Sequence, residues 1–153
     1  HPRAVYRDTP RMMRVVLDTN VIVSAIRAER GPLAIIREGW LRGRFHVVVS
    51  DPLLAEVERT LTKPYFAARL GPARIQRFLN VLKETAMFQP ITEPVAGVAT
   101  HPEDDWILAT AQQAGAHFLV TGDKALQALG RFGETRLVDP AHFAQILDSM
   151  RED

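Results

Sequence analysis

The alternation of short apolar runs with longer amphipathic stretches constrains the fold of this chain more than any other feature. Most of the runs are apolar at nearly every position, which is typical of parallel strands buried on both faces. The expected strands are residues 14–17, 45–49, 118–121 and 136–138, with a short extended piece at 87–91. The stretches with helical periodicity are residues 21–26, 32–41, 53–61, 65–70, 73–85, 103–114, 124–129 and 141–150. The sequence therefore predicts an α/β fold with three layers (α/β/α), in which helices cover both faces of a central, mainly parallel twisted sheet.

Proline and aspartate mark some of the expected boundaries. Asp51 followed by Pro52 is a favourable N-cap and first-turn pair for the helix at 53–61. Residues 92–102 contain prolines and have no periodicity, so we expect them to form a connecting loop.

Length and composition favour one domain. A chain of 153 residues, of which 46% are hydrophobic, can bury a core without disulfides or other cross-links. We expect this domain to span residues 13–150, after a disordered lead-in at 1–12 that is rich in arginine and proline. No signal peptide is recognisable and the apolar runs are too short to span a bilayer, so we expect a cytoplasmic protein without a membrane partner.

The chain has no cysteine, which excludes a disulfide framework and a thiolate metal site. Any metal must therefore be held by oxygen or imidazole ligands, and oxygen ligands favour a hard cation. The formal net charge is only +1, but the two halves differ: residues 1–77 hold 14 Lys and Arg against 7 Asp and Glu, whereas residues 78–153 hold 5 against 11. This asymmetry is compatible with a basic face beside an acidic site, and equally with a solvated surface whose charges happen to segregate.

Acidic residues recur where the expected strands end. Asp18 follows the first strand, Ser50 and Asp51 follow the second, and Asp123 comes shortly after the strand at 118–121. Residues 103–105 (Glu-Asp-Asp) begin the helix that precedes that strand. In open parallel sheets, ligands bind beside the carboxyl ends of the strands, so we expect these acids to face one cleft.

Several carboxylates in one cleft repel one another unless a cation neutralises them. Mg²⁺ and Mn²⁺ take oxygen ligands, can activate a water molecule and can stabilise the charge of a phosphodiester transition state. Phosphoryl chemistry is therefore the natural class of reaction for such a site.

The residues alone only partly identify the acids of the site. Asp104 has apolar residues at i+3, i+4 and i+7 and is therefore predicted to face the core, with Asp105 about a quarter turn away. Glu56 and Glu58 flank the apolar stripe of the helix at 53–61, and periodicity does not choose between them. Each acid also has a structural interpretation, because Asp18, Asp123 and residues 103–105 could simply cap helices or complement their dipoles.

Four separated motifs together resemble the PIN-domain family, most of all its toxin branch. They are Leu17-Asp18-Thr19-Asn20, Ser50 with Glu56, Glu103-Asp104-Asp105, and Val120-Thr121-Gly122-Asp123. The resemblance runs in order from about Met13 to Leu147. It implies a parallel-sheet nuclease fold and endonucleolytic cleavage of RNA that depends on Mg²⁺ or Mn²⁺, commonly by the toxin of a toxin-antitoxin pair (VapC-like).

The resemblance also implies site residues and partners. It selects Glu56 over Glu58. It also agrees with helix phase in selecting Asp104, and Asp105 is the second choice for that position. The implied partners are an RNA substrate, a cognate antitoxin and a second copy of the chain. The catalytic and metal-binding residues would be Asp18, Glu56, Asp104 and Asp123, supported by Thr19, Asn20, Ser50 and Thr121.

The sequence departs from the family pattern at two positions. His101 stands where an Asp before Pro102 is common, and Ala125 where a further Asp often follows the Lys. The second departure leaves Asp123 alone in its corner and indicates low affinity for a second metal. A lone His in a proline-containing loop is usually solvent-exposed, so we do not assign His101 as a general base.

These observations predict a hydrolase in which the four acids hold one or two metal ions and a water attacks an RNA phosphodiester in line. Arginines of the first half, with Arg27, Arg30, Arg42 and Arg44 as candidates, would hold the RNA backbone. The alternative is a catalytically weak PIN-like domain that binds RNA or protein. A phosphoaspartate receiver and a haloacid-dehalogenase phosphatase fit poorly, because the first needs paired acids after the first strand and the second needs an Asp where Asn20 stands.

Overall fold

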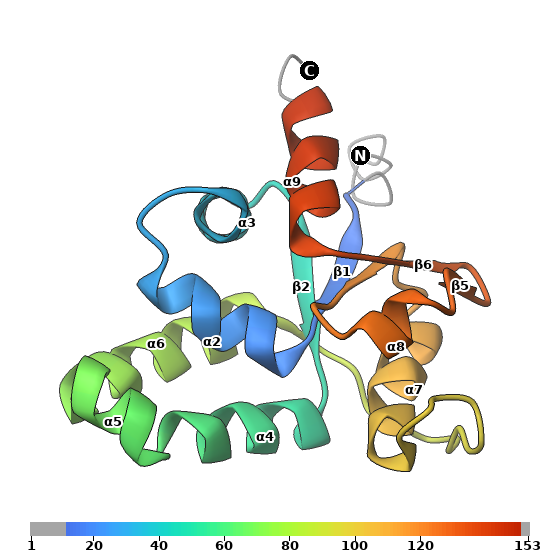
Figure 1. Cartoon of the computed structure of the whole chain (residues 1–153), viewed down its shortest axis with the longest axis horizontal. Helices are drawn as coiled ribbons and strands as arrows, with labels where there is room; N and C mark the ends of the chain where they lie inside the picture. The colour runs from blue at the N-terminus through green and yellow to red at the C-terminus, as the bar shows by residue number, and fades with distance from the viewer. Residues whose placement is uncertain (1–11, 151–153) are drawn as a thin grey trace, which may run out of the picture.

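The computed structural model describes residues 12–150, in which six strands form a single sheet with the order β3-β2-β1-β4-β6-β5 (Figure 1). The expected lead-in at 1–12 lies outside the described residues except for Met12. Neighbouring strands are parallel apart from β5, which pairs antiparallel with β6. The strands are β1 (Arg14–Leu17), β2 (His46–Val49), β3 (Met87–Phe88), β4 (Phe118–Val120), β5 (Arg131–Phe132) and β6 (Thr135–Val138).

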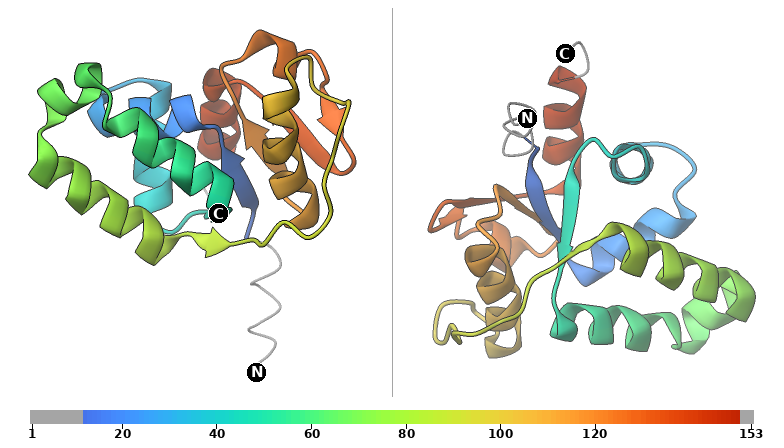
Figure 2. Two further views of the ribbon diagram at one scale, coloured as in Figure 1. Left: turned by 90° about the horizontal axis from the view of Figure 1, so that it is seen from below. Right: turned by 180° about the vertical axis from the view of Figure 1, so that it is seen from behind.

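Helices pack on both sides of this sheet, as expected for an α/β fold. Helices α2 and α3 lie on one side of β1 and β2, and α7 lies on the other, while α4, α5 and α6 extend away from the sheet on the α2 side (Figures 1 and 2). The helices are α2 (Thr19–Arg27), α3 (Pro32–Leu41), α4 (Asp51–Leu61), α5 (Pro64–Leu70), α6 (Pro72–Thr85), the 3₁₀ helix η2 (Pro102–Asp104), α7 (Asp105–Gln113), α8 (Lys124–Gln127) and α9 (Pro140–Ser149).

The core lies where the two middle strands meet the helices. Val15, Val16 and Leu17 of β1 and Leu119 and Val120 of β4 are completely buried. Their β-branched and leucine side chains alternate between the two faces of the sheet and so contact helices on both sides. This burial fixes β1 and β4 side by side and determines which residues meet just beyond their carboxyl ends.

Two details differ from the sequence-based predictions. The hairpin strand β5 was not predicted, because a two-residue strand leaves no periodic pattern. Asp51 is not the N-cap of α4: the helix begins at Asp51 and its N-cap is Ser50. Most other predicted boundaries lie within two residues of those observed.

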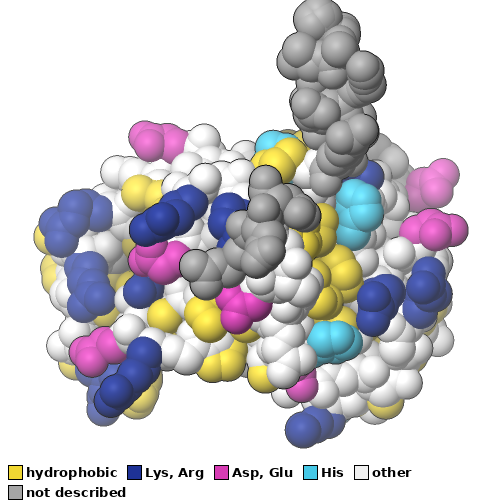
Figure 3. Space-filling model, turned by 90° about the horizontal axis from the view of Figure 1, so that it is seen from above, with side chains coloured by type: hydrophobic (Ala, Val, Ile, Leu, Met, Phe, Trp, Pro, Cys, Tyr) yellow, Lys and Arg dark blue, Asp and Glu magenta, His cyan; other side chains and the backbone are white. Residues whose placement is uncertain are grey.

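The parallel strands place their carboxyl ends at one edge of the sheet, which is the edge seen from below in Figure 2. Figure 3 shows the opposite edge, where basic side chains are spread over the surface with acidic ones among them. Among the described residues, no helix combines the length and the apolar character needed to cross a membrane.

Candidate functional site

Asp18 lies at the centre of the candidate site. It directly follows β1, where its backbone N–H continues the ladder to β4 by donating to the Val120 carbonyl (2.9 Å). Its carboxylate caps α2 by accepting from the backbone N–H of Thr19 (2.8 Å), and its other oxygen accepts from the Thr121 hydroxyl (2.7 Å). Leu17 pairs with Val120 in the register of β1 and β4, so the residues that follow them, Asp18 and Thr121, lie close together.

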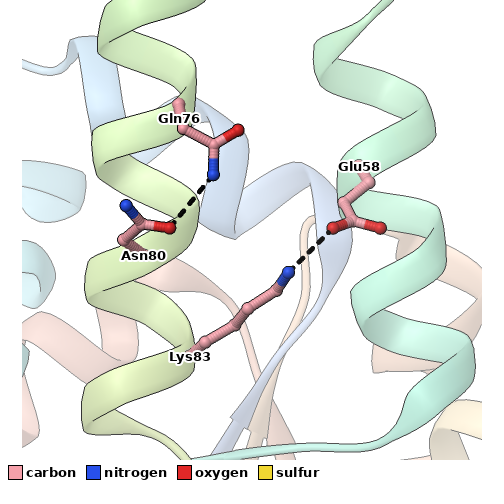
Figure 4. A network of polar contacts seen from close by, with 4 residues as sticks. All are labelled: Glu58, Gln76, Asn80 and Lys83. Atoms are coloured by element: carbon pink, nitrogen blue, oxygen red, sulfur yellow. Dashed lines mark hydrogen bonds and ion pairs between the residues drawn. The ribbon is translucent and has the colours of Figure 1, made fainter.

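Glu56 reaches the same place from α4, which packs against α2. The Thr19 hydroxyl donates to the Glu56 carboxylate (3.0 Å), so Thr19 contacts Asp18 through its backbone and Glu56 through its side chain. Glu58 points elsewhere and forms an ion pair with Lys83 of α6 (3.1 Å; Figure 4). The geometry therefore places Glu56 rather than Glu58 beside Asp18, a choice that periodicity left open.

Asp123 completes this group from the loop after β4. Its backbone N–H donates to the Thr121 hydroxyl (3.0 Å), which in turn donates to Asp18. Its carboxylate caps the short helix α8 by accepting from the N–H groups of Ala125 (2.8 Å) and Leu126 (3.3 Å). Asp123 is therefore both a helix cap and a charge close to Asp18, which joins the two interpretations that the sequence left open.

The electrostatics of Asp18 reflect this crowding. Burial raises the pKa of the Asp18 carboxyl, and the negative charges of Glu56 and Asp123 raise it further. The hydrogen bonds from Thr121 and Thr19 oppose this effect by stabilising the carboxylate. A cation bound among these oxygens would relieve the repulsion, so the donor set suits a hard divalent ion in its chemistry. In this conformation, however, no three acidic or histidine side chains of residues 12–150 are grouped as a metal site.

The two adjacent acids at the start of α7 differ in a way that helix phase did not predict. Asp105 is buried, and its carboxylate accepts from the backbone N–H groups of Gly97 (3.0 Å) and Ala99 (2.7 Å). Asp104 is only half-buried, at the end of η2. The prediction that Asp104 faces the core instead of Asp105 was wrong, because residues 102–104 form a 3₁₀ turn and α7 begins at Asp105, two residues later than predicted.

The structure also places the four expected supporting residues. Thr19 and Thr121 bond directly to the acids, while Asn20 is exposed. Ser50 is fully buried, and its hydroxyl pairs with the Thr110 hydroxyl (2.8 Å), which ties the start of α4 to α7 instead of contacting an acid.

Gln127 was missed by sequence reasoning. Its side chain amide donates to the Thr121 carbonyl (2.7 Å) from the last residue of α8. It therefore helps to hold the strand-end loop that carries Thr121 and Asp123. No signal in the sequence marked this glutamine, because its partner is a backbone atom six residues away.

Three of the four candidate arginines, Arg30, Arg42 and Arg44, line one cavity between α3 and Asp148. Arg42 and Arg44 precede β2 and therefore lie at the amino-terminal edge of the sheet, opposite the acids. Arg44 donates to the Leu147 carbonyl (2.7 Å), and Arg27 donates to the Tyr65 hydroxyl (3.2 Å). Arg30 borders a cavity beside Gly122, at the edge that carries the acids. The assignment of these arginines to the RNA backbone stays a prediction.

Comparisons with solved structures show the same fold in proteins of low sequence identity. VapBC2 from Rickettsia felis, described as bound to a DNA fragment from its promoter, is 18% identical with a TM-score of 0.57, over 83% of this chain and 98% of that chain. VapC20 from Mycobacterium tuberculosis, described as a sarcin-ricin loop cleaving toxin, is 16% identical with a TM-score of 0.54, over 80% and 98%. A Pyrobaculum aerophilum protein is 16% identical with a TM-score of 0.55, over 90% and 91%.

The sequence itself provides the family assignment. No curated protein sequence matches this chain. The family description of the PIN domain matches residues 14–125, a range that contains Asp18, Glu56, Asp104 and Asp123 and most of the chain. The fold of the neighbouring structures agrees with this match, as do the strand-end acids. The chain belongs to the PIN-domain family and has the nuclease fold of that family.

Proposed function

We propose that this protein is a metal-dependent endoribonuclease that hydrolyses RNA phosphodiester bonds. The observation that carries the proposal is the meeting of Asp18, Glu56 and Asp123 at the carboxyl-terminal edge of the sheet, where two of the acids raise the pKa of the third. Acids that repel one another are costly, and they are found together where they bind a cation or transfer protons. Membership of the PIN-domain family supports the same reading.

The proposed ligands of Mg²⁺ or Mn²⁺ are Asp18, Glu56, Asp123 and Asp104, the acid before α7. A bound divalent ion would supply an activated water and charge stabilisation for the phosphoryl transition state. Thr19 and Thr121 orient the carboxylates of Glu56 and Asp18 with hydroxyl hydrogen bonds. We leave Asp105 out of the ligand set, because its carboxylate already holds the backbone of Gly97 and Ala99.

We further propose that the protein is the toxin of a toxin-antitoxin pair that acts on RNA in the cytoplasm, with an antitoxin partner and a homodimeric state. Support comes from the shared fold of VapC20, which is described as cleaving the sarcin-ricin loop, and of VapBC2. A co-purification test follows: expression with the protein encoded beside it should yield a complex whose RNA cleavage is suppressed.

The second candidate is a PIN-like domain that binds RNA or protein with little catalysis. It is favoured by the absence of a grouped metal site among the described residues. The two candidates differ in whether added metal changes the protein. Calorimetric titration with Mn²⁺ should show binding that Asp18→Asn abolishes if the site is catalytic, and no binding if the domain is only a scaffold.

The decisive experiment is cleavage of labelled single-stranded RNA by wild-type protein with Mg²⁺ or Mn²⁺, with EDTA, and by Asp18→Asn protein purified in the same way. Cutting that needs both the metal and Asp18 supports the proposed nuclease. Cutting that persists in EDTA, or in Asp18→Asn, would point to a contaminant or to chemistry without a metal. A set of varied RNAs left intact, with no metal bound, would favour the binding domain.

A further inference from the structure

A cavity of about 410 Å³ opens beside the acids, at the same edge of the sheet. It lies between three segments that are distant in the sequence: the start of α3 with the turn before it, the loop after β4 and the start of α9. Its walls include Pro32 and Leu33 from the first segment, Gly122 from the second and Pro140 from the third. Gly122 is next to Asp123 in the chain, so the cavity borders the candidate site directly.

Two cations stand at this cavity. Arg30 and Lys124 both line it and both are exposed, so their side chains can reach a ligand without losing a buried partner. Lys124 follows Asp123 directly, whereas Arg30 approaches from the other side of the cavity, on the turn that leads into α3. A carboxylate is also present, but Asp139 is the N-cap of α9 and accepts from the His142 N–H (2.7 Å).

The shape and chemistry of the cavity fit one kind of ligand. Small-molecule pockets typically measure about 300–1,000 Å³ and have mainly apolar walls with a few polar groups that fix orientation. Proline and leucine side chains can pack against the flat face of a base, and an open space surrounds Gly122, where an added Cβ would meet no other atom within 4 Å. Arg and Lys are the side chains that contact phosphates most often. An unpaired nucleotide of a single strand offers a base and flanking phosphates at the same time.

We propose that this cavity binds one nucleotide of the RNA strand next to the phosphodiester that the acids cleave. The base and ribose occupy the cavity against Leu33 and Pro140, and Arg30 and Lys124 contact the phosphates on either side of this nucleotide. The inference rests on the proposed function, since it names the subsite that holds the substrate of the same acid site. It also gives a reason for RNA that is unpaired at the point of cleavage, because a base within a duplex cannot enter the cavity.

The test measures binding separately from cleavage. All proteins carry Asp18→Asn, and the affinity for a fluorescent single-stranded RNA is followed by anisotropy at several salt concentrations. Arg30→Ala combined with Lys124→Ala should raise Kd by about tenfold or more, on the scale of two lost charge-assisted contacts. The slope of log Kd against log salt should fall by about 1.4, because each phosphate contact on a single strand contributes about 0.7.

The matched control removes the same two charges elsewhere. Arg77→Ala with Arg131→Ala acts on Arg77, an exposed residue of α6 that lines a different cavity, and on Arg131, which pairs with Arg136 of β6. This protein should bind RNA with nearly the same Kd and the same slope of log Kd against log salt. Only the small effect of a lower net charge should remain. If both double variants weaken binding equally, the cavity has no special role and the inference fails.

A third variant tests the cavity apart from its charges. Ala141 lines the cavity near the start of α9, and Ala141→Leu narrows it without changing charge. This variant should weaken RNA binding and leave the salt slope unchanged. Unchanged binding would show that no nucleotide enters the cavity.

The failure of the inference can be told apart from the failure of the proposed function. Metal-dependent cleavage by the wild type together with unaltered binding in the Arg30 and Lys124 double variant would overturn the subsite and leave the nuclease intact. No detectable binding of any RNA would overturn the subsite, and the separate cleavage assay would then decide the function.

Discussion

The hydroxyl of Thr121 donates a 2.7 Å hydrogen bond to the carboxylate of Asp18, although the two residues are 103 positions apart in the chain. The same hydroxyl oxygen accepts from the backbone N–H of Asp123 (3.0 Å). Thr121 is completely buried, whereas its two partners are only partly buried. One side chain thus links two acids of the site and partly offsets the rise in the pKa of Asp18.

Thr121→Val should weaken both the site and the fold. The change removes the hydroxyl at nearly constant volume, so the pKa of Asp18 should rise further, and the free energy of unfolding should fall by about 1–3 kcal/mol. Carbon-detected NMR titration of the Asp18 carboxyl and chemical denaturation measure the two effects. Thr135→Val is the matched control, since Thr135 is also buried and donates to the Ala116 carbonyl (2.7 Å) away from the acids. It should lower stability without moving the pKa of Asp18.

Asp18→Asn should make the metal-free protein more stable at neutral pH. Because the folded state raises the pKa of Asp18, it binds the proton more tightly than the unfolded chain does. The contribution of Asp18 therefore favours folding below the ordinary aspartate pKa of 3.8 and is lost as the pH rises through the raised value. In EDTA, Asp18→Asn should melt above the wild type at pH 7, and the difference should shrink in acid. A lower melting temperature at pH 7 would contradict this account.

The raised pKa of Asp18 also has a consequence for metal binding. Metal ligands must be deprotonated, so metal affinity should fall as the pH drops through the raised value, which lies above the range of an ordinary aspartate. Thr121→Val should move this decline to a higher pH still. A pH profile of Mn²⁺ binding for both proteins checks the shift, and overlapping profiles would separate Asp18 from metal binding.

Glu56→Gln and Glu58→Gln should have opposite outcomes, although both change one glutamate of the same helix. Glu56 accepts from Thr19 beside Asp18, so its loss as a ligand should abolish metal-dependent cleavage. Glu58 pairs with Lys83 on an exposed face, with 45% of its side chain accessible (Figure 4). Glu58→Gln should keep cleavage and change stability by less than about 1 kcal/mol. Equal loss of activity in the two variants would show that the orientation of α4 differs in the working protein.

Asp105→Ala should destabilise the protein by about 3 kcal/mol, because it leaves two backbone N–H groups without their charged acceptor. Hydrogen exchange at the amides of Gly97 and Ala99 should become faster at the same time. Asp104→Asn should leave the exchange at these amides unchanged and abolish metal-dependent cleavage. If these two amides exchanged faster in Asp104→Asn, or no faster in Asp105→Ala, the roles assigned here to the two acids would be wrong.

The sequence predicted most of this fold because its patterns are local. The β-branched runs and amphipathic stretches identified the longer helices and the main strands, and the rule for parallel sheets placed Asp18 and Asp123 at one edge. A family resemblance was needed to choose Glu56 over Glu58, because these two glutamates lie on opposite sides of the apolar stripe of the helix. The bond between Glu56 and Thr19 now supplies a physical reason for that choice.

The errors arose where one residue of offset mattered. Helix phase applies only to residues inside the α-helix, and Asp104 instead ends the 3₁₀ turn Pro102–Asp104, so that Asp105 is the buried acid. The hydroxyl of Ser50 pairs with Thr110 across 60 residues, a contact that no local pattern encodes.

The position of β4 between β1 and β6 has a consequence for how the protein is made. Asp18 and Glu56 leave the ribosome well before β4, the strand that brings Thr121 and Asp123 beside them. Chains are synthesised from the amino terminus at about 5–20 residues per second, so the first two acids emerge several seconds before the rest of the site. A nascent chain therefore carries an incomplete site from the synthesis of Glu56 until that of Asp123. Fragments released by premature termination before β4 should be unable to assemble it.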